Sequence, residues 1–150
     1  MSVFLDIAQQ HSIADVAFEA AIIAAYGAND HAAFDQTFAA RELNDQAYFL
    51  FLFTRLEGEI DTAFDKLVSN KSVGLWADVR AWQVWRDRDR IELMAKVELL
   101  LEKGHRECEE LRSFYRHRNV IAHGDQWKTQ FAIPAVAQRM HDIVAAFATA

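Results

Sequence analysis

The sequence predicts an all-α fold, a single antiparallel bundle of about five helices. Only one Pro and five Gly occur among 150 residues, so few positions favour turns, and 52% of the residues are apolar. Apolar side chains recur at intervals of three and four along most of the chain, which is the spacing of one helix face. No segment shows the strict alternation of a half-buried strand. We therefore expect one helical domain over residues 1–150 with short connections.

Three helices are expected in the first half of the chain. Ser12 has the side chain of an N-cap residue, and Gly27 has the freedom to end a helix in the left-handed conformation. The apolar face between them comprises Ile13, Val16, Ala17, Ala20, Ile23 and Ala24. Asn29 or Asp30 opens a shorter helix to about Ala40. Residues 45–68 form the clearest helix, with an inward stripe of Phe49, Leu52, Phe53, Leu56, Ile60, Ala63, Phe64 and Leu67.

The second half is expected to hold three more segments after a less regular link at residues 69–88. A helix ending near Gly104 carries Ile91, Met94, Val97 and Leu101. Another helix runs from about Arg106 to Ala122. Pro134 suits the first position of a last helix, since its missing N–H has no partner there. The inward residues of that last helix are Val136, Met140, Ile143 and Phe147.

Charge and cysteine content restrict the functions that the chain can serve. Residues 1–70 hold three Lys and Arg against eleven Asp and Glu, whereas residues 71–150 hold thirteen against eleven. This balance argues against non-specific duplex binding, which needs many phosphate contacts, but allows a local anion site in the second half. A single cysteine, Cys108, fits the cytoplasm, and the longest apolar run, at 47–53, is too short to cross a bilayer.

The stretch RHRNVIAHG at residues 116–124 contains the candidate active site. On a helical wheel, Arg118 falls in the middle of an apolar arc that includes Leu111 and Phe114. An unpaired guanidinium there would be costly. Three arrangements meet that cost: an ion pair with a carboxylate, for which Glu57 and Glu59 are candidates, a contact across a subunit interface, or a cleft that receives an anion.

His123 lies about 140° around an ideal helix from Arg118, five residues later. Gly124 favours a left-handed helix end at this point, which makes His123 the terminal residue. A loosened last turn allows the imidazole to swing towards Arg118. The alternative interpretation is that His123 simply caps the helix C-terminus.

The segment from Arg118 to His123 resembles the signature of the HEPN superfamily (higher eukaryotes and prokaryotes nucleotide-binding domains). That signature is an Arg, a polar residue and a His after four to six intervening residues, here Arg118, Asn119 and His123. Its position, late in an all-helical chain and before a last helix, matches as well. The resemblance implies a helical domain that commonly forms a homodimer with the two motifs facing each other. Many members are metal-independent endoribonucleases, several of them toxins or antiviral effectors, while others bind nucleotides, RNA or nucleotidyltransferases.

The residue types suit RNA cleavage without a metal or other cofactor. Histidine titrates near neutrality and can act as general base or acid, here through His123. The guanidinium of Arg118 offers a fork of donors that matches phosphate oxygens. Asn119 can orient the phosphate or the histidine. A symmetric dimer would supply two histidines for the two proton transfers, which favours dimerisation.

Two other groups of residues are weaker candidates for a functional site. His105, Cys108 and His117 are zinc-ligand types, but Cys108 lies on an inward stripe and His117 points away from it, so no metal site is predicted. Residues 76–90 interleave tryptophan and arginine, as single-stranded nucleic-acid binders do. The tryptophans and arginines are Trp76, Trp82, Trp85, Arg80, Arg86, Arg88 and Arg90. Because Asp78, Asp87 and Asp89 offset the charge, buried tryptophans with surface ion pairs are the preferred interpretation.

Two functional classes follow from these residues. The first is a ribonuclease acting through Arg118 and His123 on single-stranded RNA or a tRNA loop, in a toxin or defence system with an antitoxin or nucleotidyltransferase partner. The second is a non-catalytic HEPN-like module that binds a nucleotide or a protein partner, in which the same residues form an ion pair and a cap. In both, the homodimer would cover outward apolar residues such as Phe51 and Val120.

Overall fold

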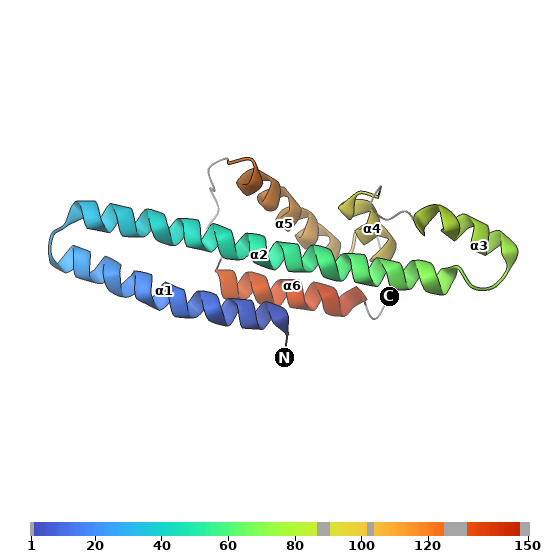
Figure 1. Cartoon of the computed structure of the whole chain (residues 1–150), viewed down its shortest axis with the longest axis horizontal. Helices are drawn as coiled ribbons and strands as arrows, with labels where there is room; N and C mark the ends of the chain where they lie inside the picture. Colours follow the sequence, from blue (N-terminus) through green and yellow to red (C-terminus); the bar gives the residue numbers. More distant parts are fainter. Residues whose placement is uncertain (1, 87–90, 102–103, 125–131, 148–150) are drawn as a thin grey trace. The chain divides into compact units, whose positions relative to one another are not determined.

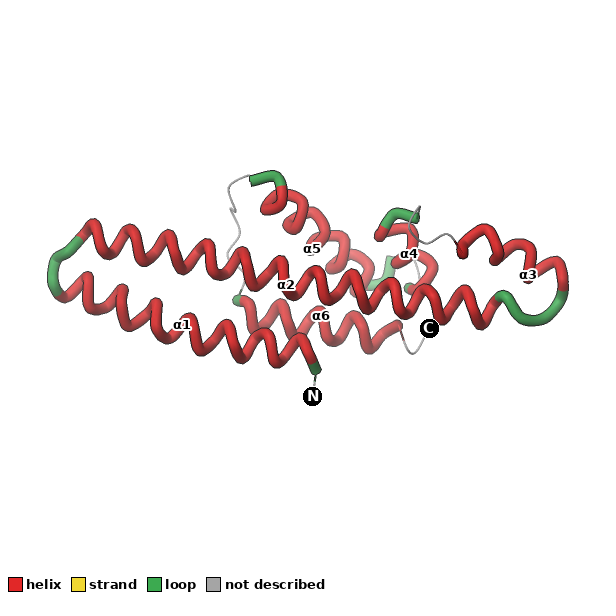
Figure 2. Tube along the Cα trace, viewed as in Figure 1, coloured by secondary structure: helices red, strands yellow, loops and turns green. Residues whose placement is uncertain are grey.

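The computed structural model describes residues 2–86, 91–101, 104–124 and 132–147, and every regular element within these ranges is helical (Figure 2). The predicted all-α fold is therefore confirmed. Figure 1 shows the elements. They are α1 (Val3–Gly27), α2 (His31–Lys71), α3 (Trp76–Gln83), the 3₁₀ turn η1 (Val84–Arg86), α4 (Leu93–Leu100), α5 (Arg106–Ala122) and α6 (Ile133–Phe147).

The chain forms two compact units, each assembled from separate stretches of sequence. Unit 1 comprises residues 1–53 and 117–141, and unit 2 comprises residues 54–116 and 142–150. The boundaries fall inside α2, α5 and α6. Unit 1 thus contains α1, the first part of α2 and the candidate active-site residues, whereas unit 2 contains α3 and α4.

The first helix begins earlier than the sequence predicted. It starts at Val3, with Ser2 in extended conformation at its N-cap position. Ser12 therefore lies inside α1, where its Oγ donates a hydrogen bond to the carbonyl oxygen of Ala8 at 3.0 Å. The prediction of Ser12 as an N-cap was wrong because a serine hydroxyl can also bond back to the preceding turn of a helix.

The predicted inward face of α1 was also wrong. Ile13, Val16 and Ile23 are 62%, 66% and 64% exposed. The buried residues are instead Phe4, Ala8, His11 and Ala25. The helix has apolar residues on two opposite sides, so periodicity alone did not select the inward one. The inward side includes polar residues, which are paired with α2 as described below.

A single helix, α2, replaces the two predicted for residues 30–40 and 45–68. Residues 41–44 contain no Gly or Pro to interrupt it. Its start was predicted correctly: the N–H of Ala33 donates to Asp30 Oδ1 at 3.0 Å, so Asp30 is the N-cap. In unit 1, α1 and α2 form an antiparallel hairpin (Figure 1).

The predicted stripe of α2 forms much of the core. In unit 1, Phe49, Leu52 and Phe53 are at most 1% exposed. In unit 2, Leu56, Ile60 and Phe64 are fully buried on the same helix. They share that core with residues from the other helices of the unit, namely Val97, Leu100, Cys108, Leu111, Phe114 and Ile143. The apolar periodicity therefore predicted the buried face of α2 correctly.

The link predicted at residues 69–88 contains helix α3 and turn η1. The last helix begins at Ile133, with Pro134 in its first turn, and buries Val136, Met140 and Ile143 as predicted. None of the helices in the described ranges has the length and apolar character needed to span a bilayer.

Candidate functional site

The motif residues lie at the C-terminal end of α5, as the sequence predicted. Arg118 directly precedes the last turn of α5 and Asn119 begins that turn. The N–H of His123 donates to the carbonyl oxygen of Asn119 at 3.0 Å. Gly124 has φ = 75°, and its N–H donates to the carbonyl oxygen of Ile121 at 3.0 Å. The left-handed helix end predicted at Gly124 is therefore confirmed.

Within the motif, the side chain of Asn119 contacts the Arg118 guanidinium. Arg118 Nη1 donates a hydrogen bond to Asn119 Oδ1 at 3.2 Å. Both residues are half-buried, whereas His123 is exposed. Arg118 and Asn119 are therefore brought together, and the imidazole of His123 is accessible one turn away. A shared cleft for Arg118 and His123 stays a prediction.

Arg118 belongs to unit 1, whereas Glu57 and Glu59, the carboxylates considered as its partners, belong to unit 2. Among the zinc-ligand types, His105 and Cys108 belong to unit 2 and His117 belongs to unit 1. Glu59, in unit 2, accepts a hydrogen bond from Arg55. His105 is exposed, and its Nδ1 lies 2.6 Å from Glu107 Oε2. Cys108 is fully buried, as predicted for a core residue.

The tryptophan-rich segment departs from the predicted burial. Trp76 is 69% exposed, while Trp82 and Trp85 are half-buried. The preferred interpretation of buried tryptophans was therefore wrong for Trp76, which lies at the first position of α3. The candidate charges at residues 87–90 lie outside the described residues, as do the side chains of Asp78 and Arg86.

The structure contains a polar cluster between α1 and α2 that sequence reasoning missed. His11 Nε2 lies 2.6 Å from Asp45 Oδ1. Arg41 donates to both oxygens of Asp15, from Nε at 2.6 Å and from Nη2 at 2.8 Å. One ligand atom from each of His11, Asp15 and Asp45 lies within 4.8 Å of the others. These four side chains are called the hairpin cluster below.

A sequence signal for the hairpin cluster exists in retrospect. His11 and Asp15 are four residues apart, as are Arg41 and Asp45, so each pair shares one face of its helix. On α1, that face also carries Phe4, Ala8 and Ala25, which are buried. Polar residues on an apolar face mark partners from another segment, because unpaired burial is costly.

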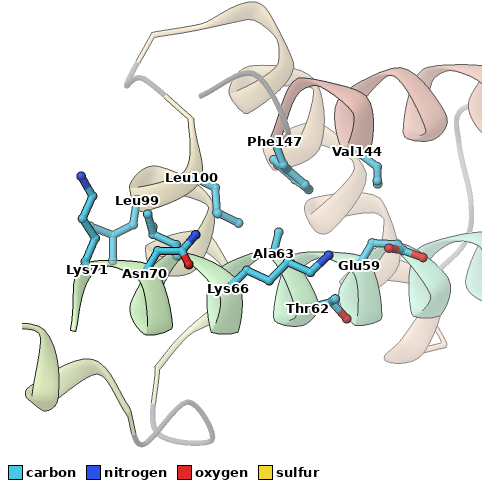
Figure 3. A pocket seen from close by; sticks show the side chains of 11 residues that line it. Glu59, Thr62, Ala63, Lys66, Asn70, Lys71, Leu99, Leu100, Val144 and Phe147 are labelled. Carbon is cyan, nitrogen blue, oxygen red and sulfur yellow. The ribbon is translucent and has the colours of Figure 1, made fainter. Parts of the chain in front are cut away.

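A cavity is lined by described residues in each unit. In unit 1, a cavity of about 620 Å³ is lined by the hairpin cluster together with further residues of α1, α2 and α6, among them Val16, Phe38 and Ile133. In unit 2, a cavity of about 680 Å³ lies along α2, with Lys66 and Asn70 on that helix, Leu100 on α4 and Phe147 on α6 (Figure 3). Neither cavity is lined by Arg118 or His123.

Comparison with known proteins gives no relative: no family model matches the chain, and neither a curated protein nor a solved structure does.

Proposed function

We propose that this chain is a HEPN-like, metal-independent endoribonuclease that acts on single-stranded RNA or a tRNA loop, with Arg118, Asn119 and His123 as its active-site residues. The observation that carries the proposal is the hydrogen bond of Arg118 to Asn119 at 3.2 Å beside the left-handed helix end at Gly124. That helix end leaves the His123 imidazole exposed one turn from a positioned guanidinium.

The chemistry follows from the three side chains. The imidazole of His123 can take the proton of a 2′-hydroxyl or deliver one to the leaving 5′-oxygen. The fork of Arg118 matches two phosphate oxygens and stabilises the charge that develops on them. The amide oxygen of Asn119 restricts the rotation of Arg118, which lowers the entropy cost of holding the guanidinium against a phosphate.

A homodimer would complete this site. Cleavage requires one proton to be removed and another to be delivered, and each chain contributes one motif histidine. A two-fold axis near the motifs would bring both histidines to one scissile phosphate. The HEPN resemblance suggests a toxin or defence system, with an antitoxin or a nucleotidyltransferase as the partner protein.

The test is cleavage of a fluorescent single-stranded RNA by the full chain in excess EDTA. The expected products carry a 2′,3′-cyclic phosphate and a 5′-hydroxyl, and a 2′-O-methyl substrate resists cleavage because it lacks the nucleophile. His123→Ala removes the proton-transfer group, and Arg118→Lys keeps the charge but loses the fork. His123→Ala should lose at least about 100-fold in rate, the usual lower contribution of general acid–base catalysis. Arg118→Lys should also lose about 100-fold, as when one group that stabilises transition-state charge is removed.

Matched controls are available on the same elements. Arg116→Lys changes an exposed arginine of α5, and His31→Ala changes an exposed histidine of α2. Both should retain wild-type activity, and helical circular dichroism checks that every variant is folded. Activity that persists in both His123→Ala and Arg118→Lys would exclude these residues as the active site.

One observation favours the alternative, a non-catalytic module that binds a nucleotide or a protein. Arg118 is half-buried and already bonded to Asn119, which also suits a structural role. If no RNA is cleaved while nucleotide binding depends on Arg118, the binding module replaces the ribonuclease.

A further inference from the structure

The hairpin cluster combines nitrogen and carboxylate donors in a largely buried place. His11 is only 5% exposed although its imidazole is polar. The side chains of Asp45 and Asp15 are 34% and 27% exposed, so their carboxylates remain reachable from the cavity that they line. The ring of Tyr48 packs edge-on against His11, with centroids 5.2 Å apart, and restricts the orientation of the imidazole.

Negative charge exceeds positive charge around this cluster. Arg41 pairs with Asp15, while Asp45, Glu19 and Glu42 add further carboxylates. The pKa of Arg41 is raised above its ordinary value, chiefly by the hydrogen bond to Asp15, with further contributions from the charges of Asp15, Asp45 and Glu19. Burial acts in the opposite direction. One arginine therefore leaves a net negative potential that favours a second cation.

The imidazole also has an unsatisfied nitrogen. His11 Nδ1 is buried and has no hydrogen-bond partner among the described residues. A buried polar atom without a partner is costly, and a bound water is a common explanation. Because no hydrogen bond in the described ranges holds a proton on Nδ1 or removes it, the ring can present the lone pair of Nε2.

We propose that His11, Asp15 and Asp45 bind a divalent transition-metal ion, with Zn²⁺ as the ion that best matches this donor set. An imidazole ligand disfavours Mg²⁺ and Ca²⁺, and three protein ligands with one open position are typical of zinc sites that also bind water. In a tetrahedral zinc site, ligand atoms lie about 3.3 Å apart. On binding, the distance between His11 Nε2 and Asp45 Oδ1 would increase from 2.6 Å. The Asp15 carboxylate, whose oxygen now lies within 4.8 Å of the other two ligand atoms, would move closer to them.

The existing contacts are compatible with the ion. Zn²⁺ would replace the proton between His11 Nε2 and Asp45 Oδ1, and that proton would move to Nδ1 or to solvent. Each carboxylate oxygen has two lone pairs, so Asp15 can bind the ion and still accept hydrogen bonds from Arg41. The ion would connect α1 to α2 and stabilise the hairpin of unit 1. This site shares no residue with the ribonuclease site proposed above and does not depend on it.

The test is Zn²⁺ binding to the full, metal-free chain, measured by calorimetry and by thermal unfolding. The expected result is one ion per chain, with a rise in Tm of about 5–10 °C when Zn²⁺ exceeds its Kd about 100-fold. His11→Gln and Asp45→Asn should each weaken binding at least tenfold, roughly the lower limit seen when metal-site residues are changed. His31→Gln and Asp35→Asn, which alter exposed residues of α2, should leave binding unchanged.

X-ray absorption on wild-type protein loaded with Zn²⁺ keeps the proposal testable if a variant fails to fold. We expect only nitrogen and oxygen ligands at about 2.0–2.2 Å and the outer-shell scattering of one imidazole. A sulfur ligand, two or more imidazoles, equal loss in His31→Gln, or binding unaffected by His11→Gln would each overturn the assignment. Equal affinity for Mg²⁺ would also overturn it, because a site with an imidazole ligand should prefer Zn²⁺.

Discussion

The imidazole of His11 lies 2.6 Å from the carboxylate of Asp45, joining α1 to α2 through a hydrogen bond on a face where apolar packing is usual. The two residues are 34 positions apart in the sequence. The bond accounts for the burial of a histidine that is only 5% exposed, and it leads to the first prediction.

Asp45→Ala should destabilise the protein by about 1–3 kcal/mol, because it leaves the buried imidazole without its partner. Urea unfolding in EDTA measures the effect without a contribution from metal. Asp35→Ala, an exposed change on the same helix, should stay within about 0.5 kcal/mol of wild type. The double variant His11→Leu, Asp45→Leu should recover most of the loss, since both polar groups are then removed together. Equal stability of Asp45→Ala and Asp35→Ala would contradict a structural role for the bond.

A second prediction concerns Lys96 in unit 2. Its Nζ donates to Asp61 Oδ1 at 2.7 Å, and its side chain is 8% exposed. Asp61→Ala should cost about 3 kcal/mol because a buried ammonium loses its partner, whereas Lys96→Met should be nearly neutral because it removes the charge and keeps the volume. Unfolding free energies of the two variants test the asymmetry. Similar losses in both would show that the pair itself supplies the stability.

A third prediction separates two glycines by their backbone conformation. Gly58 lies inside α2, where an added Cβ meets no atom within 4 Å beyond the neighbouring residues and backbone of its own helix. Gly58→Ala should therefore stabilise the protein by about 0.5–1 kcal/mol. Gly124 has φ = 75°, so Gly124→Ala should destabilise by about 1–2 kcal/mol through steric strain. Gly124→Asn should be milder, since Asn adopts this conformation more readily. Thermal and urea unfolding measure all three, and a stabilising Gly124→Ala would disagree with this helix end.

The fourth prediction is that the protein sediments as a homodimer at micromolar concentration. Phe51 is 65% exposed and Val120 is 37% exposed, so both are available to an interface. Phe51→Glu and Val120→Glu should shift the protein towards monomer, because a charge buried without a partner is costly. Ile23→Glu on α1, at a residue about as exposed as Phe51, serves as the control. Sedimentation of the wild-type protein as a monomer would contradict the predicted homodimer. Dissociation caused by Ile23→Glu alone would indicate that the interface lies on α1 instead.

Local features of the sequence were sufficient to predict the all-α fold, the buried stripe of α2 and the position of the motif. The stripe that includes Phe49, Ile60 and Phe64 repeats at helical spacing, and these residues are buried. Asp30 and Gly124 act through backbone groups only a few residues away, so the start of α2 and the end of α5 were predicted from neighbouring residues. Arg118, Asn119 and His123 were placed at a helix end for the same reason.

Tertiary structure decided which side of α1 is buried. Both sides of α1 carry apolar residues, so the buried side depends on which partners α2 supplies. Asp45 pairs with His11, and Arg41 pairs with Asp15. These pairs offset the free-energy cost of burying polar groups on that side. The hairpin cluster could not be predicted from either helix alone, since its donors come from residues 11, 15 and 45 and meet only when the chain folds back. By itself, the sequence determined the helical character of the chain, the start of α2 and the position of the motif, because these depend on neighbouring residues. Pairing between distant residues determined the buried face of α1 and the hairpin cluster.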